Sequence, residues 1–124
     1  MEKIYTDKAP VAIGPYSQAM RVGNLVYTSG QIPLNPESSA IDATDVEGQT
    51  EQVCKNLAAV LEAAGSSMDK VIKTTCFLTD MANFATFNAV YAKHFPSCPA
   101  RSCVAVKELP KGSLVEVEVI AEIG

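Results

Sequence analysis

The chain is poor in several kinds of residue. Its 124 residues include no Trp, one His and only two Arg, and 19% of them are charged. No apolar run approaches the roughly 20 residues that a membrane-spanning helix needs. Acidic residues outnumber basic ones by 14 to 10, which gives a formal net charge of −4, and the basic residues are scattered. The sequence therefore disfavours nucleic acid as a partner, because a phosphate backbone is bound by dense positive charge.

The cysteines are few and show no Cys-x-x-Cys pair. They are Cys54, Cys76, Cys98 and Cys103. A secreted disulfide scaffold of this length would have them at higher density. The first eight residues contain no apolar segment typical of a secretion signal. We therefore expect free thiols and a cytoplasmic protein.

Apolar residues, in contrast, make up 48% of the chain. No repeat, low-complexity tract or linker divides the sequence, so we expect residues 1–124 to form a single domain. A domain this small, with so few charges, has too few polar residues to form its whole surface. Some of its apolar surface must therefore be buried against another subunit. The composition therefore predicts an oligomer.

The first third of the chain predicts a hairpin followed by a loop. Two β-prone runs, 17–22 and 25–29, flank Gly23-Asn24, and glycine supplies the positive φ that a two-residue turn requires. Prolines then keep the segment 31–43 out of regular structure. We expect that segment to be a loop.

The middle of the chain predicts a helix, a strand and a second helix. From Asp45, an N-cap residue, apolar side chains recur at helical spacing as far as Gly65, which is typical of a helix C-terminus. The run 71–78 is rich in β-branched residues and predicts a strand. Asp80 is then expected to cap a helix whose aromatic residues also recur at helical spacing.

Two further strands are expected over 101–107 and 114–123, and the second alternates apolar and acidic residues. Together the elements predict an α+β domain with both helices on one face of a mixed sheet. The other face would need a cover, and a symmetry mate is the simplest one. A simple hairpin around residues 110–112 would set Glu116 nearer Lys107 than Arg101.

Several common catalytic patterns are absent. Neither a Gly-x-Gly-x-x-Gly or Walker phosphate loop nor a Gly-x-Ser-x-Gly elbow occurs, so we expect no nucleotide cofactor and no serine nucleophile of that type. His94 with Cys98 or Cys103 is a possible nucleophilic pair, but cysteines that simply fill the core are the favoured interpretation. The same three residues match no compact zinc knuckle, so no metal is expected.

Polar residues at the ends of elements remain as candidates. Arg101 follows Pro99-Ala100, has no acidic neighbour in sequence, and suits bidentate capture of a carboxylate. An ion pair with a glutamate of the last strand is an equally good interpretation. Glu116 shares its strand face with Glu118, so a solvated carboxylate row is the ordinary explanation for it.

Four separated motifs together resemble the RidA type of the YjgF family, the reactive intermediate deaminases. They are Ala12-Ile13-Gly14-Pro15-Tyr16-Ser17-Gln18-Ala19, Thr28-Ser29-Gly30-Gln31-Ile32-Pro33, Phe84-Ala85-Thr86-Phe87-Asn88-Ala89-Val90-Tyr91 and Pro99-Ala100-Arg101-Ser102-Cys103-Val104. They occur in the family's order and span essentially the whole chain. The resemblance implies a chorismate-mutase-like α+β fold and a homotrimer with three sites between subunits.

The resemblance also implies a reaction, the hydrolysis of 2-enamines and 2-imines such as 2-iminobutanoate and 2-iminopropanoate to 2-keto acids and ammonia. It assigns the substrate carboxylate to Arg101 and the water to Glu116. The other residues that it places in the pocket are Tyr16, Ser29, Gly30, Asn88 and Cys103. An imine is already electrophilic, so the reaction needs orientation and proton transfer rather than a cofactor or metal.

Two rival functions remain open. Related proteins have been described as endoribonucleases or translation inhibitors, which the acidic composition makes a poor expectation here. A trimer that binds keto acids without turnover, as a sensor or chaperone-like module, is the stronger rival. Turnover that depends on Arg101 distinguishes an enzyme from such a module.

Overall fold

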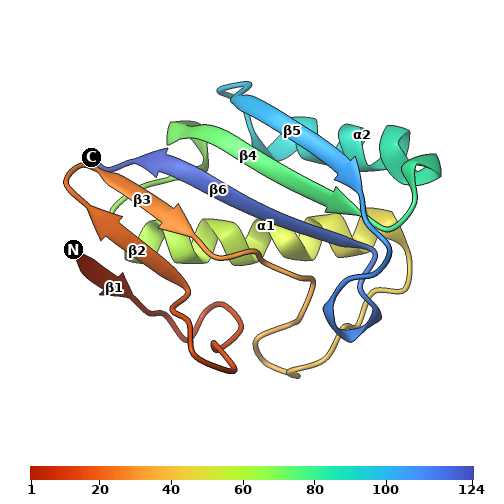
Figure 1. Cartoon of the computed structure of the whole chain (residues 1–124), viewed down its shortest axis with the longest axis horizontal. Helices are drawn as coiled ribbons and strands as arrows, with labels where there is room; N and C mark the ends of the chain where they lie inside the picture. Colours follow the sequence, from red (N-terminus) through yellow and green to blue (C-terminus); the bar gives the residue numbers. More distant parts are fainter.

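The computed structural model describes all 124 residues and contains one six-stranded sheet and two α-helices (Figure 1). The strands are β1 (Glu2–Ile4), β2 (Ala19–Val22), β3 (Leu25–Thr28), β4 (Val71–Leu78), β5 (Ala100–Ala105) and β6 (Val115–Glu122). The helices are α1 (Val46–Ala63) and α2 (Phe84–His94), with short 3-10 helices η1 (Met68–Lys70), η2 (Met81–Asn83) and η3 (Pro110–Gly112). The strand order is β1-β2-β3-β6-β4-β5, so the last strand of the chain lies inside the sheet.

Both α-helices pack on the same face of the sheet and leave the other face uncovered, as Figure 1 shows. All neighbouring strands are antiparallel except β4 and β5, which are parallel. A parallel pair needs a crossover connection, and α2 supplies it. The expected α+β fold, with two helices on one face of a mixed sheet, is confirmed. No helix is both long enough and apolar enough to span a bilayer.

The alternation in β6 decides which of its side chains are buried. Val115, Val117, Val119 and Ala121 are each at most 2% exposed and face the helices. Burying one such side chain stabilises the fold by about 1.5–3 kcal/mol, so this row fixes the sheet against α1. The intervening glutamates and Ile120 therefore point to the uncovered face.

Local signals in the sequence set most of the element boundaries. Gly23 has a φ of 59° in the turn between β2 and β3, as that two-residue turn requires. The Asp45 side chain accepts a hydrogen bond from the Gly48 backbone N–H at 2.8 Å and begins α1. Gly65, with a φ of 83°, follows the end of α1. These predictions are confirmed.

Three expectations differ from the structure. Strand β1 was not expected, because three residues are too few to show a period. Asp80 caps η2, and α2 begins only after it at Phe84. The last two strands do not form the simple hairpin that would set Glu116 nearer Lys107 than Arg101, because β4 lies between β5 and β6.

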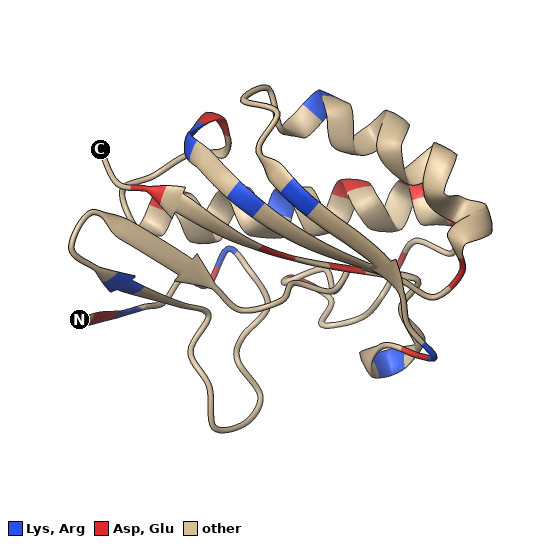
Figure 2. Ribbon diagram, turned by 45° about the horizontal axis from the view of Figure 1, so that its top comes forward, with Lys and Arg blue, Asp and Glu red and all other residues tan.

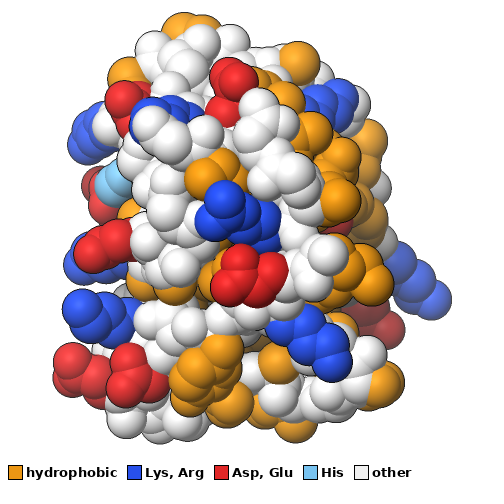
Figure 3. Space-filling view, turned by 90° about the vertical axis from the view of Figure 1, so that its left-hand side faces the viewer, with side chains coloured by type: hydrophobic (Ala, Val, Ile, Leu, Met, Phe, Trp, Pro, Cys, Tyr) orange, Lys and Arg blue, Asp and Glu red, His pale blue; other side chains and the backbone are white.

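The uncovered face of the sheet is partly apolar. Tyr27 of β3 is 44% exposed and Val104 of β5 is 47% exposed. Figure 3 views the molecule from one end, and hydrophobic side chains gather on its right-hand side, which is the side of this sheet face. Contiguous exposed apolar surface is typical of an interaction site.

Candidate functional site

Arg101 lies on the edge strand β5 and points toward the helix side of the sheet. Its register partner Thr74 on β4 is fully buried, and in-register neighbours share a face. The guanidinium carbon lies 4.7 Å from the ring centroid of Tyr91 and 5.5 Å from that of Phe84. Its Nη1 donates to the Asn88 side-chain oxygen at 2.7 Å. Helix α2 therefore orients the guanidinium.

No carboxylate of the chain pairs with Arg101. The only ion pair joins His94 Nε2 to Glu51 Oε2 at 2.9 Å, between α2 and α1. The alternative interpretation, an ion pair between Arg101 and a glutamate of β6, is thus wrong within the chain. The guanidinium N–H groups of Arg101 that do not bond to Asn88 can donate to the two oxygens of an external carboxylate.

Tyr91 is the platform on which the guanidinium lies. Its hydroxyl is 2.8 Å from Thr74 Oγ1, and its ring stacks on Phe95 with centroids 4.3 Å apart. Burial raises the pKa of the Tyr91 phenol, although the hydrogen bond with Thr74 opposes this shift. The ring is therefore held from two directions beneath Arg101. Asn88, Tyr91 and Arg101, which line a cavity of about 480 Å³, are called the arginine half-site below.

Glu116 lies on β6 and points to the uncovered face. Its carboxylate rests against Gly30, where an added Cβ would lie only 2.8 Å from Glu116 Cδ. Only a residue without a side chain leaves room for the carboxylate in this position. Tyr16, Ser29, Gly30 and Glu116 line a second cavity of about 480 Å³ and are called the glutamate half-site.

Local hydrogen bonds fix the polar groups of the glutamate half-site. The Ser29 hydroxyl donates to the backbone oxygen of Ser17 at 2.6 Å. The Tyr16 hydroxyl accepts from the Ile13 N–H at 3.3 Å. Ile13, Tyr16 and Ser17 lie in the segment that leads into β2, and Ser29 directly follows β3. The two ends of the first hairpin and β6 therefore share the site.

Burial raises the pKa of the Glu116 carboxyl above its usual value, and the negative charge of Glu118 raises it further. A carboxylate with a raised pKa is a stronger base than an ordinary one. Glu116 is therefore suited to accept a proton from a bound water.

The two half-sites lie on opposite faces of the same sheet. Glu116 is in register with Phe77 on the uncovered face, whereas Arg101 is in register with the buried Thr74 on the helix face. Within one chain, the predicted site residues thus form two groups that do not meet. A substrate that contacts both groups needs a second copy of the chain.

Cys103 lies on β5 two residues beyond Arg101 and is in register with Cys76. Burial raises the pKa of the Cys103 thiol, although the charge of Arg101 opposes this shift. A protonated thiol is a poor nucleophile. His94 hydrogen-bonds to Glu51. The nucleophilic role that the sequence left open for Cys103 is therefore not favoured.

The role of Tyr91 as a platform was missed in the sequence. It was expected only as one of the recurring aromatic residues of the helix. Asn88 and Tyr91 are three residues apart on α2, and residues at that spacing share a helix face. This spacing is the signal that could have joined Tyr91 to the candidate site.

The comparisons with known proteins agree on one family. The family model described as Endoribonuclease L-PSP matches residues 6–123. Reactive Intermediate Deaminase A, a chloroplastic protein of Arabidopsis thaliana, is 47% identical over 98% of this chain and 66% of its own length.

Solved structures match the whole fold. RidA from the Antarctic bacterium Psychrobacter sp. PAMC 21119 has a TM-score of 0.95 and 45% identity, over 99% of this chain and all of that one. E. coli TdcF, crystallised with bound serine, has a TM-score of 0.95 and 43% identity over the full length of both chains. The chain therefore belongs to the endoribonuclease L-PSP family, the YjgF/RidA family that its motifs resemble.

Proposed function

We propose that this protein hydrolyses 2-imino acids and their 2-enamine tautomers, such as 2-iminobutanoate and 2-iminopropanoate, to 2-keto acids and ammonia. We further propose that each site forms between two subunits of a homotrimer. One observation carries the proposal: a cationic and a carboxylate half-site lie on opposite faces of one sheet, each fixed by its own contacts. The relationship to a reactive intermediate deaminase supports it.

The arginine half-site binds the substrate carboxylate. Two N–H groups of Arg101 match the two carboxylate oxygens, while Asn88 and the Tyr91 ring hold the guanidinium plane. The related E. coli TdcF was crystallised with serine, which carries the same α-carboxylate. This anchor orients the imine carbon toward the neighbouring subunit.

The glutamate half-site supplies the water. Glu116 accepts one proton as the water oxygen bonds to the imine carbon, and the C=N π electrons move to nitrogen. The same carboxyl then returns its proton to the nitrogen of the resulting carbinolamine. Loss of ammonia breaks the C–N bond while the hydroxyl proton passes to the ionised Glu116 and its oxygen becomes the carbonyl of the 2-keto acid. The ionised Glu116 also favours the cationic iminium form, which water attacks most readily.

A head-to-tail contact between copies satisfies this geometry. The arginine half-site of one subunit then faces the glutamate half-site of the next, and such a contact repeated around a closed ring uses every half-site. The exposed apolar side chains of the uncovered sheet face supply the surface that three copies would bury.

Complementation between two impaired variants tests the proposal. Arg101→Ala removes one half-site and Glu116→Gln removes the other. When equal amounts are unfolded together and refolded, about one quarter of the sites in a randomly mixed ring receive both wild-type residues. We expect 2-iminopropanoate hydrolysis near one quarter of the wild-type rate, whereas each variant alone should retain at most about one tenth of that rate.

The matched control mixes Arg101→Ala with the double variant Arg101→Ala/Glu116→Gln, in which no site regains Arg101. Rescue in that control, or no rescue in the first mixture, would contradict a site shared between subunits.

Binding of a 2-keto acid by the wild-type protein without any imine turnover would favour the sensor over the enzyme. The Lys and Arg residues spread over strands, helices and loops without forming a strip that could follow a phosphate backbone (Figure 2), so the charge distribution does not favour RNA as the substrate, although the family model is described as an endoribonuclease.

A further inference from the structure

An apolar trough leads away from the glutamate half-site. A cavity of about 350 Å³ shares Tyr16, Gly30, Ile32 and Pro110 with the cavity beside Glu116. A further cavity of about 210 Å³ adjoins the 350 Å³ cavity. These two cavities share Pro10, Val11, Ile13, Leu34 and Lys111. We call the surface formed by Pro10, Val11, Ile13, Ile32 and Leu34 the side-chain trough.

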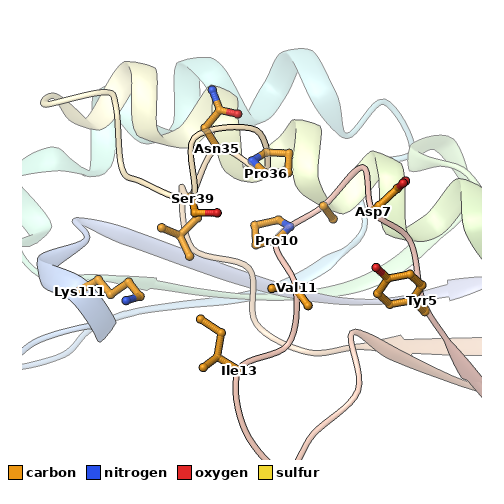
Figure 4. A pocket seen from close by; sticks show the side chains of 11 residues that line it. Tyr5, Asp7, Pro10, Val11, Ile13, Asn35, Pro36, Ser39 and Lys111 are labelled. Carbon is orange, nitrogen blue, oxygen red and sulfur yellow. The ribbon is translucent and has the colours of Figure 1, made fainter.

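The side-chain trough has two walls from distant parts of the sequence. Figure 4 shows its outer part, where Val11 and Ile13 of the N-terminal segment lie across from Pro36 and Ser39 of the loop before α1. Val11 is 59% exposed and Ile13 is 67% exposed. Apolar side chains that remain exposed while lining a cavity indicate an apolar ligand.

A buried amide fixes the first wall. The Gln18 side chain is 2% exposed and accepts from the Thr6 N–H at 2.7 Å. Its amide nitrogen donates to the backbone oxygens of Thr6, at 3.0 Å, and Pro10, at 2.8 Å. The segment that carries Val11 and Ile13 is thereby tied to β2.

A second buried amide fixes the other wall. Asn56 of α1 is 1% exposed, and its amide nitrogen donates to the backbone oxygens of Ile32, at 3.1 Å, and Leu34, at 2.9 Å. Its side-chain oxygen accepts from Gln52 at 2.9 Å. Because both walls are held by satisfied buried groups, the trough exists before any ligand binds.

We propose that the side-chain trough binds the hydrocarbon side chain of the 2-imino acid, and this inference rests on the proposed function. The carbon attacked by water carries the imine nitrogen, the carboxylate and the side chain. The substrate carboxylate binds Arg101 and the attacking water lies at Glu116, so the side chain of the substrate extends from the reacting carbon in a third direction. The trough opens at Gly30 and Tyr16, immediately beside Glu116.

The trough therefore selects for substrates with larger apolar side chains. An imine derived from leucine can extend an isobutyl group into it, whereas one derived from alanine carries only a methyl group and buries much less apolar surface there. A hydrocarbon contact of this kind changes the ratio of kcat/KM between two substrates by about tenfold or more. We therefore expect branched aliphatic 2-imino acids to be good substrates.

Polar substitutions in the trough test this assignment. The double variant Val11→Thr/Ile13→Thr places two hydroxyls in the trough at positions whose side chains are exposed, so the fold is retained. We expect kcat/KM for the leucine-derived imine to fall about tenfold, with little change for the alanine-derived imine. An amino-acid oxidase generates each imine in the assay from the parent amino acid. Val22→Thr is the matched control, because Val22 is 52% exposed on β2 and does not line the trough.

The outcomes separate the two proposals. A selective loss for the leucine-derived imine supports the side-chain trough. If the wild-type protein hydrolyses both imines and the double variant loses both equally or keeps both, the trough assignment is overturned and the deaminase function stands. If the wild-type protein hydrolyses neither imine, the proposed function fails and the trough assignment fails with it.

Discussion

Glu116 occupies a position that favours chemistry over stability. Its carboxylate lies over Gly30 in a partly buried setting, with Glu118 two residues away on the same strand face. Burial and the neighbouring charge both raise the pKa of the Glu116 carboxyl. A group whose pKa is raised on folding favours the folded state below its unfolded pKa, and this contribution is lost as the pH rises through the folded pKa. At neutral pH the ionised Glu116 is therefore unfavourable for folding.

The substitution Glu116→Gln is expected to lower kcat by at least about tenfold while KM changes less, because the loss is in proton transfer. The same substitution is expected to raise Tm at pH 7, and the gain should shrink as the pH falls toward 4. Steady-state kinetics and thermal unfolding at both pH values measure these effects.

Glu118→Gln is the control on the same strand face. A fall in kcat for Glu118→Gln equal to that for Glu116→Gln would contradict a specific role for Glu116. In the wild-type protein, kcat/KM should decline with falling pH at a higher value than an ordinary carboxyl would give, since the base must be ionised.

At the scale of elements, local sequence signals located most helices and strands but not their partners. Strand β4 was predicted with its exact bounds, because β-branched residues fill 71–78 and turn signals flank it. The strand β5 was also predicted from its residues, but its place in the sheet could not be predicted from them. Its pairing depends on the crossover through α2, and no spacing within 101–123 records that β4 lies between the last two strands.

The same limit applies to the candidate site. The resemblance placed Arg101 and Asn88 in one pocket, and the structure shows the hydrogen bond between them, which the sequence did not predict. The distribution of the two half-sites over opposite faces follows from strand order, which the motifs do not encode. The residues alone therefore could not show that one chain holds the two groups apart, although the resemblance implies sites between subunits.

Helix α2 contacts Arg101 through Asn88 and through Tyr91, whose ring lies under the guanidinium and also stacks on Phe95. Tyr91→Phe keeps the ring and loses the hydrogen bond to Thr74, whereas Tyr91→Leu loses both. We expect KM to rise about fivefold in Tyr91→Leu relative to Tyr91→Phe, since stacking of Arg on an aromatic face contributes about 1 kcal/mol.

The comparison of these two variants isolates the ring, because both lose the bond to Thr74 and both keep an apolar residue in the core. Substrate titrations give KM and kcat separately, and urea unfolding gives the stability of each variant. Equal KM values in the two variants, at similar stability, would show that the ring does not position Arg101.

At the scale of the whole molecule, the apolar surplus of the sequence and the division of the site have one common explanation. The sheet buries one face against α1 and α2, and the other face keeps exposed apolar side chains such as Tyr27 and Val104. The same face carries the glutamate half-site at β6. An assembly that covers this face would both bury apolar surface and bring a second chain to Glu116.

The substitution Val104→Asp tests this explanation. A charge placed on the uncovered face is costly to bury, so we expect the variant to be a folded monomer by analytical ultracentrifugation, with little imine hydrolysis. Lys55→Asp, on the exposed side of α1, changes the net charge in the same direction and should stay assembled and active. If Val104→Asp is active as a monomer, the site is complete within one chain. If it remains assembled, the uncovered face does not join the subunits, because a buried unpaired carboxylate at Val104 would not be tolerated there.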